Sequence, residues 1–380
     1  MVLALWSSGL RAQDVDIDAL KFTATQGTRY DSNLFRRNTD VRSETVATTT
    51  AGIELDKRYS LQRVEFDANL ASHRYRSNDY LNYNALNYRA VWHWSVTPRL
   101  HGTLSRTRTE AINNFDYFYS TERNLRTDEI TAFNAEGELG RDWRLLGGVQ
   151  RARRDNERPT AEQGDYAQRD VSAGVRRLFT SGSSISYRYL DGQGDYFNRL
   201  PNVSAQPTAF VQREHEVRVV WAASGKTRIN ATAAYVDRKH QALAVRDYAG
   251  ARGNLSVQWA ATGKSGMQLT LARDIGSYQT NTSSYSTSNR LSLYPYWSVG
   301  PHTVLYASLD AARYAFEGTL PGMAGNNRRD RGTGASVGVR WEPFNALSLD
   351  ATLGREQRDS NLDGFDYTNT SARLAAKFSF

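Results

Sequence analysis

Charged side chains and histidines recur at every second position along much of this 380-residue chain. Arg63, Glu65 and Asp67 share one parity, and Arg89 and His93 repeat that pattern in the next segment. Alternate residues of an extended strand project to one face, so these side chains would form one polar surface. The candidate residues for this surface are Arg63, Glu65, Asp67, Arg89, His93, Arg144, Arg176, Arg188, Glu216, Arg218, Arg228, Arg252, Arg290 and Arg340, with Glu214, Asp310 and Asp350 of the same parity.

Such a surface has two interpretations. In the simpler one, opposed carboxylates and guanidinium groups brace an inside wall by charge-assisted hydrogen bonds. In the other, the arginines line a wet passage that favours an anionic or sugar-like solute. The bracing role is the better expectation for any single residue, and the sequence leaves both open.

No catalytic, cofactor-binding or metal-binding set is predicted, and no cofactor is expected. The six histidines lack the spacing of zinc ligands, and there is neither a nucleophile elbow nor a phosphate-binding loop. Residues 332–338 miss the dinucleotide-binding glycine pattern by one position and are predicted to form a strand with close-approach glycines. Residues 191–195 (DGQGD) could hold Ca²⁺ in a loop, but a turn with solvated carboxylates is the better expectation.

The elements that carry these residues are predicted to be β-strands. Period-two alternation continues from Leu20 to the last residue; Val64, Phe66, Ala68 and Leu70, for example, hold the apolar parity of one segment. The mean hydropathy is −0.62, and no run of eighteen apolar residues occurs, which excludes transmembrane helices. It does not exclude a membrane, because a barrel strand turns only alternate residues to lipid.

The connections between the segments alternate strictly between short and long. Short turns are expected near 57–60, 97–98, 140–142, 180–183, 224–226, 262–265, 300–302 and 342–345. Longer connections are expected near 30–42, 75–84, 108–126, 154–166, 191–211, 239–247, 275–287, 316–331 and 357–368. Eight turns and nine loops predict an all-β, transmembrane, antiparallel up-and-down β-barrel of eighteen strands, with short periplasmic turns and long extracellular loops.

Aromatic residues support this prediction independently. Seven of the eight tryptophans lie within a few residues of an expected short turn, as in a periplasmic aromatic girdle: Trp92, Trp94, Trp143, Trp221, Trp259, Trp297 and Trp341. Phe378 and the terminal Phe380 resemble the signal read by the barrel-assembly machinery, the first expected partner. Arg153 and Arg177 break the alternation, but both lie near expected strand ends, where a long side chain can reach the interface.

Composition adds further limits. Of 48 basic residues six are lysines, which leaves 42 arginines, and the formal net charge is +8. These arginines are scattered along the strands instead of clustered, and no motif supports a nucleic-acid partner. The chain has no cysteine, which suits the cell envelope but decides nothing alone. We expect a residual signal-peptide-like leader at 1–12, a periplasmic segment at 13–19 and the barrel at 20–380.

Short motifs resemble one known family. The segment 27–36 (GTRYDSNLFR) is similar to the exosortase-associated exopolysaccharide outer-membrane proteins (EpsL), within a broader group of β-barrel porins. Weaker similarity lies at 75–76 (YR), 79–83 (DYLNY), 104–108 (LSRTR), 124–127 (NLRT) and 142–145 (DWRL). The resemblance implies a role in exopolysaccharide biosynthesis or export, with a polysaccharide or oligosaccharide substrate and other export components as partners. It carries over no catalytic or binding residue.

The leading expectation is therefore a non-enzymatic barrel of the Gram-negative outer membrane that serves exopolysaccharide export, in contact with outer-membrane lipid and lipopolysaccharide. The main alternative is a general or solute-selective porin without a polysaccharide role. An outer-membrane lipid-modifying enzyme would need a Ser/His/acid cluster at one rim, and the histidines are too scattered for that. A soluble β-sandwich or adhesin is the last alternative.

Overall fold

The computed structural model describes residues 19–115, 120–158, 164–197, 208–242, 244–278, 283–319 and 327–380. Within these ranges eighteen strands form one antiparallel sheet, and β1 pairs with β18 to close it. The predicted fold class and strand number are confirmed. The predicted leader and residues 13–18 of the predicted periplasmic segment lie outside the described residues, and Ala19 already begins the first strand.

The strands and two short 3₁₀ helices follow one another along the chain. Their bounds are β1 Ala19–Asp31, β2 Glu44–Tyr59, β3 Gln62–Tyr75, η1 Asp79–Leu81, β4 Tyr83–Thr97, β5 Leu100–Ile112, β6 Leu125–Leu139, β7 Trp143–Asn156, β8 Tyr166–Leu178, β9 Ser184–Tyr196, β10 Ala209–Ser224, β11 Thr227–His240, η4 Ala244–Arg246, β12 Tyr248–Trp259, β13 Ser265–Ser277, β14 Tyr285–Gly300, β15 Thr303–Glu317, β16 Arg329–Phe344, β17 Leu347–Ser360 and β18 Tyr367–Ser379. Among the described residues, no helix is long and apolar enough to cross a membrane.

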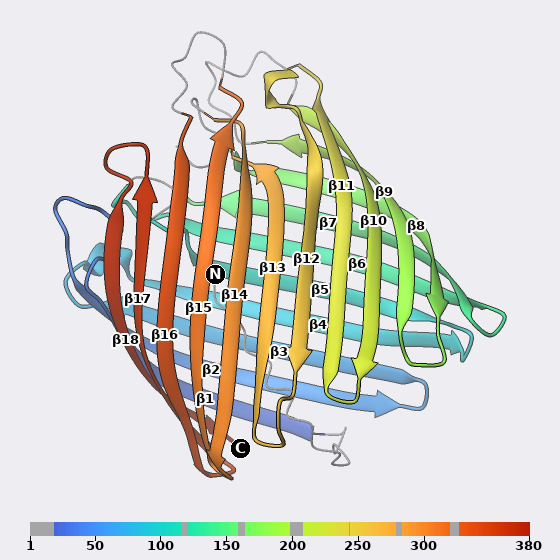
Figure 1. Cartoon of the computed structure of the whole chain (residues 1–380), viewed down its shortest axis with the longest axis horizontal. Helices are drawn as coiled ribbons and strands as arrows, with labels where there is room; N and C mark the ends of the chain where they lie inside the picture. Colours follow the sequence, from blue (N-terminus) through green and yellow to red (C-terminus); the bar gives the residue numbers. More distant parts are fainter. Residues whose placement is uncertain are drawn as a thin grey trace.

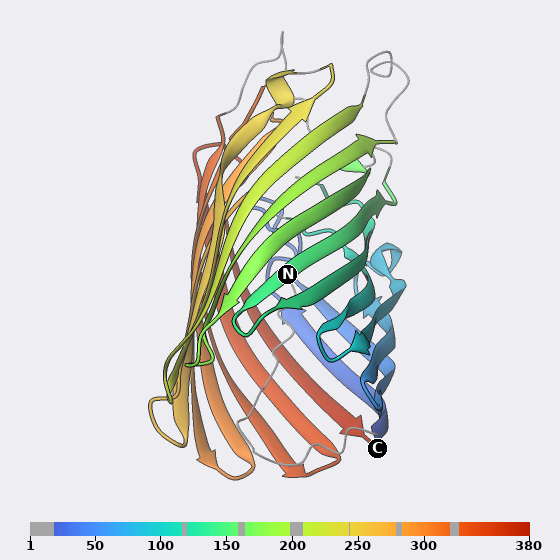
Figure 2. The ribbon, with the colours of Figure 1, turned by 90° about the vertical axis from the view of Figure 1, so that its right-hand side faces the viewer.

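Each strand pairs with its sequence neighbours, so the barrel is a continuous meander. The closing seam runs from Thr23↔Ser379 to Asp31↔Ser371. Figure 1 shows the strands of the front wall crossing those of the back wall at a wide angle, and Figure 2 shows them slanting around the barrel. Strong strand tilt is required to close a sheet, and closure leaves no unpaired edge for hydrocarbon to meet.

The eight short turns and nine long connections occur in the predicted order, but several strands are longer than predicted. β5 runs to Ile112 and β6 begins at Leu125, so the loop predicted at 108–126 is shorter. β9 runs to Tyr196, so residues 191–195 belong to a strand and the loop prediction for them is wrong. Both differences have the same cause. At the long-loop end the outward-facing residues are charged instead of apolar, so the sequence loses its apolar–polar alternation although the strands and their backbone hydrogen bonds continue.

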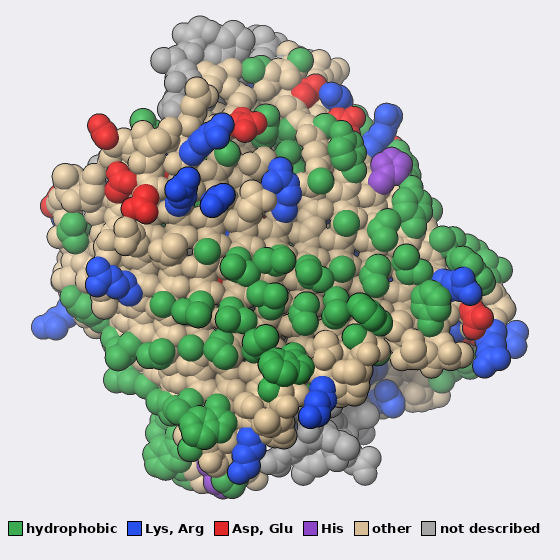
Figure 3. Space-filling model, in the orientation of Figure 1, with side chains coloured by type: hydrophobic (Ala, Val, Ile, Leu, Met, Phe, Trp, Pro, Cys, Tyr) green, Lys and Arg blue, Asp and Glu red, His purple; other side chains and the backbone are tan. Residues whose placement is uncertain are grey.

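The register assigns every strand residue to one of two faces, because directly paired residues share a face. Val64, Phe66 and Leu70 share a face with the outward-exposed Trp92, whereas Arg63 pairs with His93 and Asp67 with Arg89 on the other. Figure 3 shows a broad band of hydrophobic side chains across the face of the outer wall in view, with charged side chains above and below it. The apolar face is therefore the outer one, and the charged face is turned inward.

Packing is dense at the long-loop end and open toward the short turns. Leu34 and Phe35 form a small cluster with the fully buried Leu81, and the Phe115 ring meets Phe35 edge-on at 5.0 Å. Charged side chains are buried there too: Asp330 is 1% exposed and binds Arg328 at 2.6 Å. Inward side chains nearer mid-strand are partly solvent-exposed, with Arg89 at 42% and Arg218 at 49%, so water has access to the inner wall between the two ends.

Candidate functional site

The candidate site is the charged inner wall, and its best-connected part lies on β3 and β4. The Glu65 carboxylate accepts hydrogen bonds from Arg89 at 2.9 Å and lies 2.9 Å from His93 Nε2 and 3.3 Å from Arg63. Arg63 also binds Asp56 of β2. One glutamate thus lies between three cationic or ionisable side chains, all of them predicted for this surface.

A second cluster joins β6, β7 and β8. Arg144 and Arg176 are directly paired residues of β7 and β8. Arg176 donates to Glu136 at 2.6 Å, and Arg144 lies 2.9 Å from Glu138 and 3.9 Å from Glu136. Two like charges directly opposite each other are unfavourable, so the glutamates of β6 are what hold this pair in place.

A third cluster lies on β9 to β12. Arg188 and Arg218 both approach Glu216, at 3.3 and 3.6 Å. The neighbouring Glu214 is almost completely buried and accepts two hydrogen bonds from Arg252, at 2.6 and 3.1 Å. Burial makes a charge expensive unless it is paired, so Glu214 fixes Arg252 more firmly than the half-exposed pairs fix their partners.

Most of the remaining predicted residues lie on β14 to β17. Arg290 binds Asp274, and Arg340 lies 3.5 Å from Asp350, whose two oxygens also accept bonds of 2.9 Å from the Tyr306 hydroxyl. Asp67 and Arg228 also face inward, but within the described ranges neither forms an ion pair. The predicted residues therefore form several separate clusters around the wall and no single compact site.

Three arginines of these clusters are in contact with water. The side chains of Arg89, Arg252 and Arg218 are 42%, 40% and 49% exposed although all three point into the barrel. Solvent access of this size requires space on the inward side of the wall. A charged wall in contact with water can brace the barrel and still interact with a passing solute.

Sequence reasoning missed the pair at the closing seam. Arg29 of β1 and Arg373 of β18 are directly paired on the inner face, and Arg29 binds Asp31 at 2.8 Å. Arg29 has the parity of Lys21, and Arg373 that of Lys377, so each could have been placed on the polar face from its own strand. That they meet depends on closure between the first and last strands, which no local pattern contains.

Arg238 of β11 was also missed, although it has the parity of Arg228 and precedes the loop predicted at 239–247. Its guanidinium donates to Gln212, Gln168, Ser277 and the Tyr196 hydroxyl at 2.6–3.2 Å. It lies 3.9 Å from the centre of the Phe210 ring. All of its donors are used, so this buried arginine cross-links strands at the long-loop end and has none to spare for a ligand.

The described part of the chain contains no cluster of side chains arranged for catalysis or metal binding. No group of three His, Asp or Glu side chains there could hold a metal ion. The glycines of the candidate calcium segment serve packing instead: a Cβ at Gly194 would meet the Phe210 ring, and one at Gly192 would meet Asp170. Gly338 likewise makes room for Tyr306, which agrees with the strand predicted at 332–338.

The aromatic residues singled out from the sequence lie on the outer face. The tryptophans are at the short-turn ends of their strands, and six of the seven are between 42% and 53% exposed. Trp94 is the exception, because its ring stacks on Phe133 at 5.4 Å. Phe380 hydrogen-bonds with Phe22 through both backbone groups at the closing seam. Its reading as an assembly signal stays a prediction.

Comparisons with known proteins agree with this architecture. Residues 218–380, the end of β10 to the C-terminus, match the model of a family described as "Putative beta-barrel porin 2". The comparison with curated proteins found no match.

Solved structures give the same fold. OccK1 (OpdK) of Pseudomonas aeruginosa is similar with a TM-score of 0.54 and 12% identity, over 95% of this chain and 99% of that one. A BenF-like porin of Pseudomonas fluorescens Pf-5 has a TM-score of 0.54 and 8% identity, over 96% of this chain and 100% of that one. OccK9 (OpdG) of Pseudomonas aeruginosa has a TM-score of 0.50 and 12% identity, over 95% of this chain and 98% of that one. The chain is a Gram-negative outer-membrane β-barrel with a porin fold.

Proposed function

We propose that this barrel is a solute-selective channel, and that its inner wall favours small anionic or sugar-like solutes. The observation that carries the proposal is the ratio of charges within the inner clusters. Glu216 is shared by Arg188 and Arg218, and Arg29 and Arg373 have only Asp31 between them within the described residues. Cations that are incompletely neutralised and wet attract anions and hydrogen-bond to hydroxyls.

The proposal is supported by geometry as well as charge. Barrels of sixteen to eighteen strands are wide enough for an aqueous channel. The solvent access of the inward arginines indicates that their donors are available to a solute. The dense packing at the long-loop end would narrow the entrance, so small solutes are favoured over large ones.

Swelling of proteoliposomes tests this function. Purified protein in vesicles is exposed to isosmotic neutral sugar, to a small carboxylate and to a cation of matching size. Vanillate, with which OpdK has been crystallised, is a suitable carboxylate probe. We expect entry of the carboxylate and the sugar to exceed that of the cation. Equal entry of all three, or none, would count against a selective channel.

Exopolysaccharide export, which the family resemblance implies, is the second candidate. It rests on segment 27–36 and the shorter motifs, and the porin interpretation has better support because both the family match and the solved neighbours are porins. Deleting the gene and measuring secreted polysaccharide distinguishes the two. Unchanged secretion together with lost solute uptake is the result that our proposal predicts.

A further inference from the structure

A row of arginines crosses the outer face of four consecutive strands at the long-loop end. Arg273 of β13 pairs with Asn289 of β14, Asn289 pairs with Arg313 of β15, and Arg313 pairs with Arg331 of β16. All four side chains are exposed. Because direct pairing keeps residues on one face, the row is continuous across the outer surface of these four strands. Figure 3 shows basic side chains above the hydrophobic band on this side of the barrel, with acidic side chains among them.

The charges of this row are poorly balanced. Arg273 donates to Asn289 Oδ1 at 2.8 Å and to the Ala251 carbonyl at 3.1 Å. Within the described ranges, neither Arg313 nor Arg331 forms an ion pair, although Asp359 is paired with Arg331 in register. Like charges directly opposite each other destabilise a sheet, so this row would be more stable with an anion bound.

The row lies at a membrane interface. On β16, ten residues separate Arg331 from Trp341 at the opposite end. At about 3.3 Å per residue and a tilt of about 40°, this is about 25 Å along the barrel axis. The apolar band of an outer-membrane barrel is also about 25 Å tall. The outward residues in between include Val337, Val339 and Ala335, so the arginines begin where the hydrocarbon layer ends.

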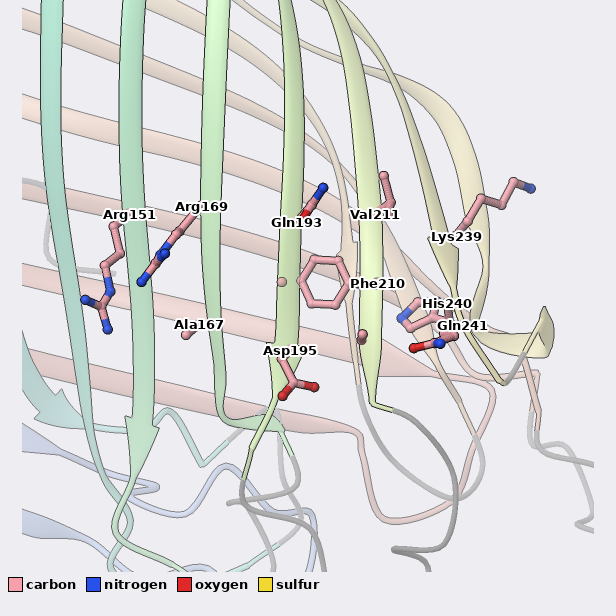
Figure 4. A pocket seen from close by; sticks show the side chains of 12 residues that line it. Arg151, Ala167, Arg169, Gln193, Asp195, Phe210, Val211, Lys239, His240 and Gln241 are labelled. Carbon is pink, nitrogen blue, oxygen red and sulfur yellow. The ribbon is translucent and has the colours of Figure 1, made fainter.

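The same arrangement recurs on β7 and β8, five strands from the end of the row on β13. Arg151 of β7 pairs directly with Arg169 of β8 on the outer face, both exposed and, within the described residues, without an ion pair. They border a hollow of about 540 Å³. Figure 4 shows the two guanidinium groups side by side, with Lys239 on the far side of the hollow.

This hollow is suited to an amphiphile. Its lining includes the small outward residues Ala167 and Ala209 and the exposed Val211, which leave an apolar floor between the cations. Asp195 also lines it, against Arg151, Arg169 and Lys239. Lys239 is itself paired with Asp237 and Asp247, at 3.6 and 3.7 Å, so the positive charge left to a ligand comes from Arg151 and Arg169, next to the apolar lining.

We propose that these outward arginines bind the phosphate groups of the phosphorylated glycolipid that forms the outer leaflet, with the Arg273–Arg331 row as the main site. Guanidinium groups bind phosphate through paired, charge-assisted hydrogen bonds, and the hydrophobic band directly below would hold the acyl chains. A protein partner fits less well, because the apolar surface next to the row belongs to the band that lipid covers.

Binding of purified lipid A to the full-length protein in neutral detergent tests the proposal, with titration followed by native mass spectrometry. Arg313→Gln together with Arg331→Gln should weaken binding of bisphosphorylated lipid A about tenfold, since each lost charge-assisted bond has a substantial cost. The matched control is Lys57→Gln with Arg177→Gln, which removes the same charge from outward positions at the short-turn end. This control should bind as the wild type does.

Three further arms make the result decisive. Dephosphorylated lipid A should bind the wild type as weakly as the glutamine variant binds the phosphorylated form, and millimolar inorganic phosphate alone should not displace the lipid. Arg313→Lys with Arg331→Lys keeps the charge and should retain most of the binding, which guards against misfolding of the glutamine variant. Equal binding of both lipid forms, or equal weakening by the control variant, would overturn the proposal.

Discussion

Arg29 and Arg373 lie directly opposite each other on the inner wall, at the seam where the first strand closes onto the last. Asp31, 2.8 Å from Arg29, is the acid that compensates this pair within the described residues. The arrangement places two wet guanidinium groups side by side facing the interior. Closure of the barrel thus creates a positive site that neither strand contains alone.

The assignment of inner and outer faces is tested by two neighbouring residues of β16. Val337 points outward among Ala307 and Leu353, and Ser336 points inward. Val337→Arg should lower the free energy of unfolding by about 2–4 kcal/mol, because it places a charge near mid-bilayer. Ser336→Arg should cost much less. Urea unfolding in lipid vesicles measures both, and equal costs would show that the faces are assigned wrongly.

Gly338 tests the packing of the inner wall. A Cβ at this position would meet the Tyr306 ring, whose hydroxyl binds Asp350. Gly338→Ala should therefore destabilise the barrel by about 1–3 kcal/mol, as overpacking commonly does.

Gly334 is the matched control for that substitution. It lies on the same face of β16, and a Cβ there would make only ordinary contacts of 3.7 Å or more. Gly334→Ala should be close to neutral. If the two alanine variants unfold at the same denaturant concentration, Tyr306 is not held over Gly338.

Glu65 tests whether the clusters brace the barrel. Glu65→Gln removes the negative charge shared by Arg63, Arg89 and His93. Because these arginines are more than a third exposed, the loss of stability should be modest, about 1 kcal/mol. The same change should raise the preference of the channel for anions. Chemical unfolding and single-channel recording measure the two effects, and a loss above about 3 kcal/mol would instead indicate a dry, structural network.

The tryptophans provide a test without altering the barrel. Trp6→Phe removes the indole outside the described residues and leaves those at the short-turn ends of the strands. Their fluorescence should be quenched more by lipids brominated near the head group than by lipids brominated near the chain end, because indole prefers the interface. Stronger quenching from the chain end would place the rings in mid-bilayer and contradict the girdle.

The strand number and order could be predicted because turn lengths and outward tryptophans are local features. Strand ends could not, since outward residues such as Arg108 and Asp191 resemble loop residues until a membrane boundary is known. The sequence suggested Arg153 and Arg177 as the exceptions to an apolar outer face. The structure shows many more at the long-loop end, where the exterior is no longer hydrocarbon.

The sequence allowed the residues of the inner wall to be predicted, but not which of them form ion pairs with one another. Parity alone placed Arg144 and Arg176 on the polar face, yet their shared acid, Glu136, was not singled out. Partners depend on register between strands, and for Arg29 and Arg373 on closure across nearly the whole chain. Neither is contained in the alternation of a single segment.

The central claim is that the inner arginines make this barrel an anion-favouring channel. The most direct measurement is the reversal potential of the purified protein in a planar lipid bilayer under a potassium chloride gradient. The wild type should conduct with a preference for chloride, and Arg29→Gln with Arg373→Gln should shift the reversal potential toward cations while the barrel stays folded. A wild type that conducts no ions, or a potential unchanged by the substitutions, would contradict the account.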